Sequence, residues 1–290
     1  MLPFELDEPK SLHEAIDLLD PNDPTVRALA GGTGLMLMMK AGAFRPNRLV
    51  SLGRIETRYG EITEADNGEL RIGAMTRLST VEHDERVIRA YPVIKRTMRT
   101  LANVRVRNTA RIGGTLSHAD PNMDLPPLLA ALGARVSIRG QHGSHRELPV
   151  ENLYAGYYET TLKAGELICE VILPAPTSWR ATYVKCTTRS ADDWPALGLA
   201  IALDLSGDTV RDCRIVLGAG SEKLTRLVET EKILRNAIID AALLRRASDV
   251  AVGEVSLTGD VRGSVPYKEE LLKVYTSRGI RMSAEEKAAP

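Results

Sequence analysis

The stretch RNTARIGGTLSHADPNMDLPPLLAALGA, residues 107–134, decides how this chain folds, because it joins a glycine pair to a helix with clear start and stop signals. Asp124 stands at an N-cap position, Pro126 lies in the first turn, and Gly133 marks the C-terminal end. A shorter stretch, AGGTG at residues 30–34, presents a second glycine pair earlier in the chain.

The two glycine pairs predict a binding site for a diphosphate. Backbone N–H groups in a Gly-Gly turn are free of side chains and can converge on one anion, and a following helix adds its positive end. Two such loops can hold a pyrophosphate, with the hydroxyls of Thr33 and Thr115 as further donors. Neither loop matches GxGxxG or GxxxxGK[ST], which argues against a Rossmann site or a P-loop. Taken alone, a Gly-Gly pair after a strand is more often a tight turn, and it is the presence of two pairs with similar flanks that favours a binding site.

Composition removes several classes of partner. Lys plus Arg and Asp plus Glu both number 38 in the 290 residues, so no general basic excess favours nucleic acid. No stretch approaches the roughly 20 apolar residues of a membrane span, and the acidic start resembles no export signal, so a cytoplasmic location is expected. The three cysteines lie far apart with no CxxC spacing, so no metal or iron-sulfur site is expected in this chain.

The pattern of elements predicts a boundary between two parts of the chain. Ser11 caps a helix with Glu14 three residues on, and the strand VRALA leads into the first glycine pair. Asn67-Gly68 indicates a hairpin, and a long helix interrupted near Pro92 precedes the second glycine pair. Two prolines in LPAPTSWR, residues 173–180, indicate a boundary, after which three strands are followed by helices.

The glycine segments and three further stretches resemble one family. LAGGTGLMLMMKAG and residues 107–134, with FELDEPKSLHEAIDLL, YVKCTTRSADDWPALGLAIAL and GDVRGSVPYKEELLKVY, are similar to the FAD-binding medium subunits of molybdenum hydroxylases, the group of carbon monoxide dehydrogenase and xanthine dehydrogenase. The resemblance spans nearly the whole chain.

The resemblance implies an α+β fold. A two-part FAD-binding domain of the PCMH (vanillyl-alcohol oxidase-like) type, residues 1–55 and 56–175, precedes a C-terminal α+β domain, residues 176–290, with a three-stranded antiparallel sheet and helices. FAD would lie between the first two parts.

The resemblance also implies a set of FAD-binding residues and assigns no catalytic residue. Leu101 would lie beside the flavin or adenine, Asp124 would accept hydrogen bonds from ribityl or ribose hydroxyls, and Lys185 would reach the flavin. Leu167 or Ile168 would contact the adenine through the backbone. The two phosphate loops would consist of Leu29, Ala30, Gly31, Gly32, Thr33, Gly34 and Leu35, and of Arg111, Ile112, Gly113, Gly114 and Thr115.

Several of these residues have a second interpretation. Asp124 can act as a helix cap only, and Lys185 can be a solvated strand lysine. Trp194 can lie against the flavin ring or pack beside Pro195, and His118 can touch a phosphate or the flavin edge or make a structural hydrogen bond.

The chain departs from the family pattern at the glycine loops. Arg111 and Thr115 replace the usual ends of the second loop, Thr and then Asn or Asp. Gly34 stands in the first loop where a polar residue is common. Backbone donors are unaffected by these changes.

The function that the resemblance implies is an electron relay. The chain would pass electrons from the [2Fe-2S] clusters of a small subunit through FAD to a terminal acceptor, beside a large molybdopterin subunit, in a dimer of heterotrimers. The alternatives are a stand-alone FAD-dependent reductase or oxidase of similar fold, and a scaffold whose glycine loops are only turns.

Overall fold

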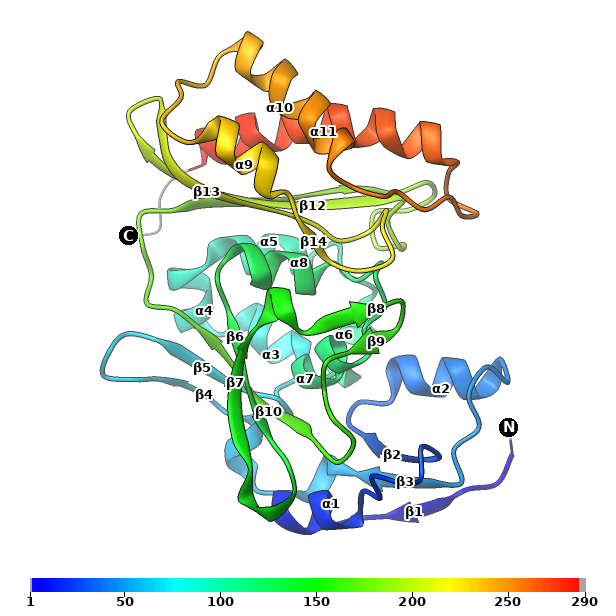
Figure 1. The fold of residues 1–290 in the computed structure, drawn as a ribbon. Helices are drawn as coiled ribbons and strands as arrows, with labels where there is room; N and C mark the ends of the chain where they lie inside the picture. Colours follow the sequence, from blue (N-terminus) through cyan, green and yellow to red (C-terminus); the bar gives the residue numbers. More distant parts are fainter. Residues whose placement is uncertain (1, 287–290) are drawn as a thin grey trace.

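A small parallel sheet forms the N-terminal part of the computed structural model, which describes residues 2–286 (Figure 1). Its strand order is β1-β3-β2, with one helix on each side. As predicted, the Ser11 hydroxyl accepts a hydrogen bond from the N–H of Glu14 at 3.1 Å and caps α1. The elements are β1 (Glu5–Asp7), α1 (Leu12–Leu18), β2 (Val26–Leu29), α2 (Thr33–Lys40) and β3 (Arg48–Ser51).

The middle part is built on a five-stranded antiparallel sheet of order β4-β5-β10-β6-β7. Asn67-Gly68 closes the β4–β5 hairpin as predicted, with Gly68 at φ 80°. A two-stranded ribbon, β8 with β9, lies beside this sheet. The strands are β4 (Ile62–Glu64), β5 (Leu70–Gly73), β6 (Arg135–Arg139), β7 (His145–Pro149), β8 (Tyr154–Gly156), β9 (Glu159–Thr160) and β10 (Leu167–Leu173).

The long helix predicted before the second glycine pair is wrong in two respects. It breaks at Asp84 as well as before Pro92, because the Asp84 carboxylate accepts hydrogen bonds from the N–H groups of Arg86 and Val87 and starts a new helix. A further short helix, α6, leads into the second glycine pair. The helices are α3 (Leu78–His83), α4 (Glu85–Ala90), α5 (Pro92–Met98), α6 (Val104–Thr109), α7 (Ile112–Ser117) and α8 (Leu125–Ala131). Single 3-10 turns are η1 (Leu52–Arg54), η2 (Thr57–Gly60), η3 (Gln141–Gly143) and η4 (Val150–Asn152).

The C-terminal part contains a four-stranded antiparallel sheet of order β11-β12-β13-β14, and not the three-stranded sheet expected. The fourth strand has only two residues, too few for a sequence pattern to reveal. Ile201 and Ile215 face the outer helices, whereas Ala200 and Val216 face α8, so both faces of this sheet are covered. The elements are β11 (Arg180–Cys186), β12 (Leu197–Ser206), β13 (Thr209–Leu217), β14 (Thr225–Arg226), α9 (Val228–Leu234), α10 (Ala241–Gly253) and α11 (Val265–Glu285).

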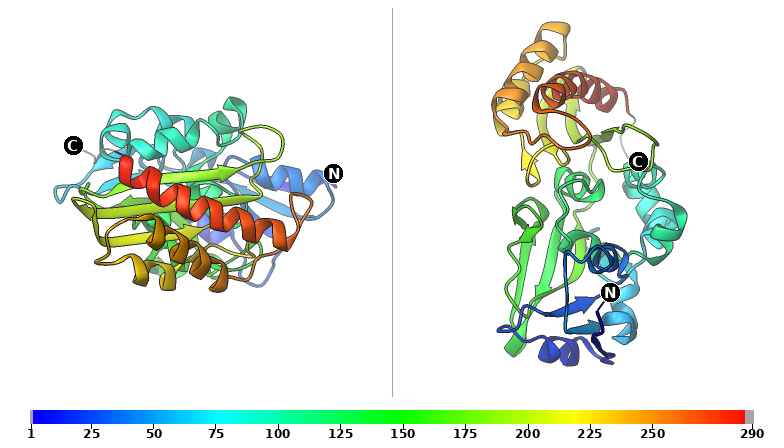
Figure 2. Two further views of the ribbon diagram at one scale, coloured as in Figure 1. Left: turned by 90° about the horizontal axis from the view of Figure 1, so that it is seen from above. Right: turned by 90° about the vertical axis from the view of Figure 1, so that its right-hand side faces the viewer.

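The molecule is elongated, with the C-terminal sheet and its helices at one end and the small parallel sheet at the other (Figure 2). Helix α11 runs along the outer face of the C-terminal sheet, and the middle part lies between the two ends. Within residues 2–286, no helix combines the length and apolar character needed to cross a membrane.

Candidate cofactor-binding site

The two glycine loops lie against each other, although about eighty residues separate them in the chain. A Cβ placed on Gly31 would stand 2.3 Å from the carbonyl oxygen of Thr109, immediately before the second loop. A Cβ on Gly114 would stand 3.3 Å from the Cβ of Ala30. The two loops are therefore close enough to serve one site, and glycine is needed at position 31 because the two backbones approach this closely. That both loops bind one ligand stays a prediction.

The first loop presents a row of backbone donors. Gly32 adopts φ 71° as the N-cap of α2, and no side chain caps this helix. The first backbone hydrogen bond of the helix runs from the N–H of Met36 to the carbonyl of Gly32 at 2.9 Å. The N–H groups of Thr33, Gly34 and Leu35 therefore have no acceptor among the described residues, and they are grouped at the positive end of the helix.

Backbone hydrogen bonds to the middle part of the chain hold the second loop in place. The N–H of Gly113 donates to the carbonyl of Ala74 at 2.9 Å, and the N–H of Ala74 donates to the carbonyl of Cys169 in β10 at 2.8 Å. Ile112 is fully buried in the core, so it offers the site only backbone atoms. The Thr115 hydroxyl donates to the carbonyl of Arg111 at 3.1 Å, one helical turn back, and so its hydrogen is used within the loop.

His118 connects the second loop with α2. A Cβ on Gly34 would stand 2.7 Å from the His118 ring, so the absence of a polar side chain at position 34 makes room for the imidazole. On its other side the ring meets Tyr158 edge to face, with centroids 5.3 Å apart. Burial lowers the pKa of His118, and Asp120 opposes this only in part. The imidazole is consequently largely neutral at neutral pH.

Two arginines stand side by side at the start of the second loop. Arg77 and Arg111 form an antiparallel bridge, flanked by hydrogen bonds from Leu78 to Ala110 and from Ile112 to Thr76. The Nε of Arg111 is buried and has no hydrogen-bond partner within residues 2–286. Burial, and then the charge of Arg77, lower the pKa of Arg111. A buried guanidinium nitrogen without a partner, next to a second positive charge, is a donor that an anion would satisfy.

A second cluster contains Asp124 and Lys185, together with the carbonyl of Thr100, the neighbour of Leu101 in the chain. The Lys185 ammonium donates to the Thr100 carbonyl at 2.7 Å and to Oδ2 of Asp124 at 2.8 Å. The Tyr183 hydroxyl donates to Oδ1 of the same carboxylate at 2.7 Å. Burial raises the pKa of Asp124, and the attraction of Lys185 offsets part of that rise. Lys185 is thus held in a buried ion pair, so its interpretation as a solvated strand lysine is wrong.

The capping interpretation of Asp124 is also wrong. Asp124 does occupy the N-cap position of α8, but its carboxylate makes no cap hydrogen bond, because both oxygens are turned toward β11. Leu167 and Ile168 begin β10 and are 8% exposed, beside the register shift between Ile168 and Glu170. They lie close in sequence to Cys169, whose carbonyl supports Ala74 under the second loop.

Trp194 belongs to neither cluster. Its side chain is 46% exposed in the loop between β11 and β12, so it is not packed in the core. The Arg262 guanidinium lies 5.4 Å from the indole centroid. Burial, and then the charge of Asp120, raise the pKa of Tyr158, and Arg262 offsets a small part of that rise. Arg262 thus lies beside Trp194 and also acts on Tyr158, the ring that meets His118.

Sequence reasoning missed Tyr183 and Arg77. Tyr183 could have been predicted, because residues two apart in a strand share a face and Lys185 had already been identified. Arg77 had no local signal, since only the bridge to Arg111 brings it to the loop.

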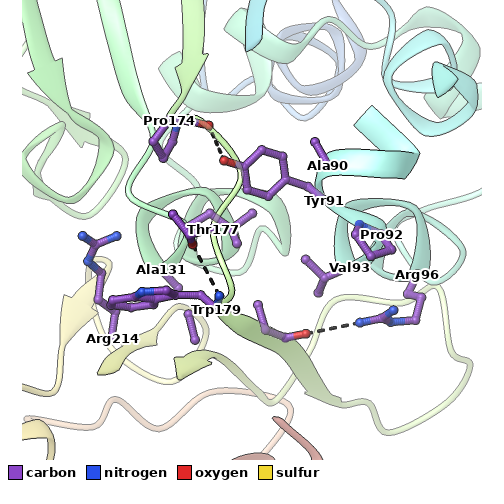
Figure 3. Close-up of a pocket in the computed structure, with 13 residues that line it drawn as sticks. Ala90, Tyr91, Pro92, Val93, Arg96, Ala131, Pro174, Thr177, Trp179 and Arg214 are labelled. Atoms are coloured by element: carbon purple, nitrogen blue, oxygen red, sulfur yellow. Dashed lines mark hydrogen bonds between the residues drawn. The ribbon is translucent and has the colours of Figure 1, made fainter. Parts of the chain in front are cut away.

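A separate cavity of about 180 Å³ lies where the middle part meets the C-terminal sheet (Figure 3). Tyr91 and Pro174 line one side, and Trp179 lines the other with the Arg214 guanidinium 4.9 Å from its ring centroid. None of the predicted cofactor residues lines this cavity.

Two family models together cover nearly all of the chain. Residues 2–176 match the FAD binding domain in molybdopterin dehydrogenase, and residues 160–283 match the CO dehydrogenase flavoprotein C-terminal domain. The chain belongs to the FAD-binding medium subunits of molybdenum hydroxylases. It is thus a subunit of a molybdopterin-dependent oxidoreductase, and its cofactor is FAD.

Known medium subunits match this chain over almost their whole length. It is 30% identical to the glyceraldehyde dehydrogenase medium chain of Sulfolobus acidocaldarius, covering 94% of this chain and 95% of that one. It is also 30% identical to the carbon monoxide dehydrogenase medium chain of Hydrogenophaga pseudoflava, with 96% of each covered.

Solved structures of such complexes share the fold. The structure of carbon monoxide dehydrogenase from Hydrogenophaga pseudoflava superposes with a TM-score of 0.94 at 30% identity over 99% of this chain and 100% of that one. Quinoline 2-oxidoreductase from Pseudomonas putida 86 gives 0.90 at 29% identity, with 98% of each chain covered.

The residues present fit FAD. The unpaired amides of α2 and the orphaned Nε of Arg111 are donors for a diphosphate, and Gly31 and Gly114 keep side chains out of the space where the loops meet. The Asp124 carboxylate receives one hydrogen bond on each oxygen, which leaves acceptor capacity for a hydroxyl.

Proposed function

We propose that this chain carries electrons from the [2Fe-2S] clusters of a small partner subunit to a terminal acceptor, in a complex with a molybdopterin-binding large subunit. The observation that supports this most directly is the pair of glycine loops in contact, with unpaired amides on the first and an orphaned guanidinium nitrogen on the second. Bound FAD supplies the ability to take electrons singly and release them singly or in pairs.

The chain's own residues bind and orient the cofactor in this proposal. Amides at Thr33 and Gly34 bind the diphosphate, and Asp124 accepts a hydrogen bond from a ribityl or ribose hydroxyl. Lys185 places a positive charge near the flavin, which favours the reduced form. The remaining contacts come from Leu29, Ala30, Gly31, Gly32, Leu35, Leu101, Arg111, Ile112, Gly113, Gly114, Thr115, His118, Leu167, Ile168 and Trp194.

The wider organisation belongs to the same proposal. The separate sheets support a division into residues 1–55, 56–175 and 176–290. The relatives named as medium chains support a complex with a large and a small subunit, for which we propose a dimer of heterotrimers. The cytoplasmic location remains a prediction.

Purification from the native source under mild conditions tests the proposal. We expect flavin absorbance with one FAD per chain, together with a molybdopterin-containing chain and a [2Fe-2S] chain identified by mass spectrometry. Turnover of a substrate by the isolated flavoprotein, without metal subunits, would instead support a stand-alone flavoenzyme. A colourless chain that takes up no added FAD would contradict both.

A matched pair of variants connects that result to the glycine loops. Gly31→Ala places a methyl group 2.3 Å from the Thr109 carbonyl, whereas Gly60→Ala meets nothing within 4 Å. We expect the first variant to lose FAD on gel filtration and the second to retain it.

A further inference from the structure

The second loop carries a feature that glycine amides do not explain, namely two adjacent arginines without counter-ions. Leu78 donates to Ala110 and Ile112 donates to Thr76, so Arg77 and Arg111 form the non-hydrogen-bonded pair between these bonds. Side chains of such a pair project to the same side and lie closest together. Thr76, Leu78, Ala110 and Ile112 project to the other side, where they are buried.

The second loop, which Arg111 begins, is packed against the first glycine loop. Arg111 is the N-cap of α7 in extended conformation, and positions 114 and 118 follow it three and seven residues on. Gly114 faces Ala30, and His118 faces Gly34. Arg111 therefore begins the segment against which the first loop and the start of α2 lie, and its bridge to Arg77 brings a second guanidinium to the same segment.

No carboxylate among the described residues neutralises the positive charges of Arg77 and Arg111. The Arg111 Nε is buried without an acceptor, and the nearby charge that acts on its guanidinium is Arg77. Neither arginine belongs to an ion pair within residues 2–286, where other arginines such as Arg107 do find carboxylates. Arg77 is exposed, so water screens part of the repulsion between the two like charges, and an anion bound between them would remove the rest.

We infer that Arg77 and Arg111 form a two-guanidinium clamp for the diphosphate of the cofactor. This inference rests on the proposed function, and it adds side-chain recognition to a site otherwise made of backbone amides. A guanidinium fork donates two parallel hydrogen bonds to phosphate oxygens, and two such forks match the charge of a diphosphate. The clamp would make diphosphate the part of FAD on which binding most depends.

The test measures FAD affinity of the refolded apo chain by quenching of flavin fluorescence. Arg77→Met and Arg111→Met are compared singly and together, with Arg105→Met as control, because Arg105 is exposed on the preceding helix α6. We expect each clamp variant to raise the Kd for FAD at least about tenfold, and the control to leave it unchanged. Raising the salt concentration should weaken binding to wild type more than binding to the double variant.

A second set of measurements separates the clamp from a loss of folding. ADP should compete with FAD in wild type and much less in the double variant, whereas adenosine should compete equally weakly in both. Arg111→Lys should recover part of the affinity. Without FAD, the double variant should unfold at a denaturant concentration no lower than wild type, since a repulsion has been removed.

Failure of the clamp and failure of the proposed function give different results. If wild type binds FAD and the double variant binds it equally well, with the same salt dependence, the clamp is wrong and the proposed function stands. If wild type binds no FAD, the proposed function fails and the clamp fails with it. If the double variant is clearly less stable than wild type without FAD, the two arginines stabilise the fold and the clamp is contradicted.

Discussion

At the scale of the residue, the buried contact between Asp124 and Lys185 joins the middle part to the C-terminal sheet. Both side chains are less than a tenth exposed, and the acid also holds Tyr183. Removing one member of a buried pair leaves the other charge uncompensated, which is much more costly than removing both.

Lys185→Met should destabilise the FAD-free chain by about 3 kcal/mol at pH 8. Burial raises the pKa of Asp124, so the native state keeps its proton to higher pH than the unfolded state does. Stability from such a group is present at low pH and declines as pH rises through the raised pKa. The loss of unfolding free energy caused by Lys185→Met should therefore be smaller at pH 5 than at pH 8. Urea unfolding at both pH values measures it, and a loss that does not depend on pH would refute the argument. Asp124→Asn combined with Lys185→Met should recover part of the stability.

Gly34 and His118 provide a second test at this scale. Gly34→Ala places a methyl group 2.7 Å from the His118 imidazole and should lower the free energy of unfolding by about 1–3 kcal/mol. In a His118→Ala background the same substitution should cost much less, since the ring is gone. A double-mutant cycle in urea gives the coupling, and additive effects would mean that the two residues are not in contact.

Individual residues show which side-chain roles could be predicted from the sequence and which could not. Ser11 was identified correctly as a cap because its partner lies three residues away, within the local pattern. The cap at Asp124 was wrong because its carboxylate bonds to residues 183 and 185, and no local rule weighs a partner from another sheet. Arg77 entered the site for the same non-local reason.

At the scale of the element, helix α9 is attached to β13 through one buried carboxylate. Glu231 is fully buried and accepts hydrogen bonds from the Ile215 N–H and the Arg226 guanidinium on Oε1. Its Oε2 accepts from Arg226 and Arg235. The helix therefore depends on a charge network as well as on packing.

Glu231→Gln should destabilise the chain by about 3 kcal/mol, because both arginines lose a buried partner. Glu229→Gln on the same helix is the control: its pair with Lys232 is more than half exposed and should contribute under about 1 kcal/mol. Thermal unfolding of both variants measures the difference. Equal effects would show that burial of the Glu231 network adds nothing.

Element boundaries could be predicted where turn-forming residues at the boundary itself mark it. Asn67-Gly68 and the proline pair at 174–176 marked a hairpin and a connection between sheets correctly. The break at Asp84 was missed because residues 78–98 keep a helical spacing across it, and α6 was too short to stand out. Cys169, Cys186 and Cys213 all lie in strands and are free thiols.

At the scale of the whole molecule, the meeting of the glycine loops could be anticipated from chemistry, because two anion-binding turns serve one diphosphate. The order of the strands could not, since register and crossover depend on contacts far apart in the chain. The resemblance to a family supplied what periodicity lacks, namely which parts lie together.

Binding of FAD should slow hydrogen exchange at the start of α2 and of α7, while α10 and α11 stay unchanged. The amides at the start of α2 lack acceptors in the chain, so the ligand is what would protect them. At a free FAD concentration 100 times its Kd, the free energy of unfolding should rise by about 2.7 kcal/mol. Exchange measured by mass spectrometry, with and without FAD, tests this. Protection confined to the C-terminal helices would place the ligand elsewhere.

The chain's two tryptophans give the C-terminal sheet its own optical labels. Trp179 precedes β11 and Trp194 follows it, and each lies beside a different arginine. Indole emission overlaps flavin absorption, so each indole can pass excitation energy to a nearby flavin. Replacing either tryptophan by phenylalanine leaves a single emitter at one known end of the strand. The decay time of that emitter then reports its distance from the flavin without any attached dye.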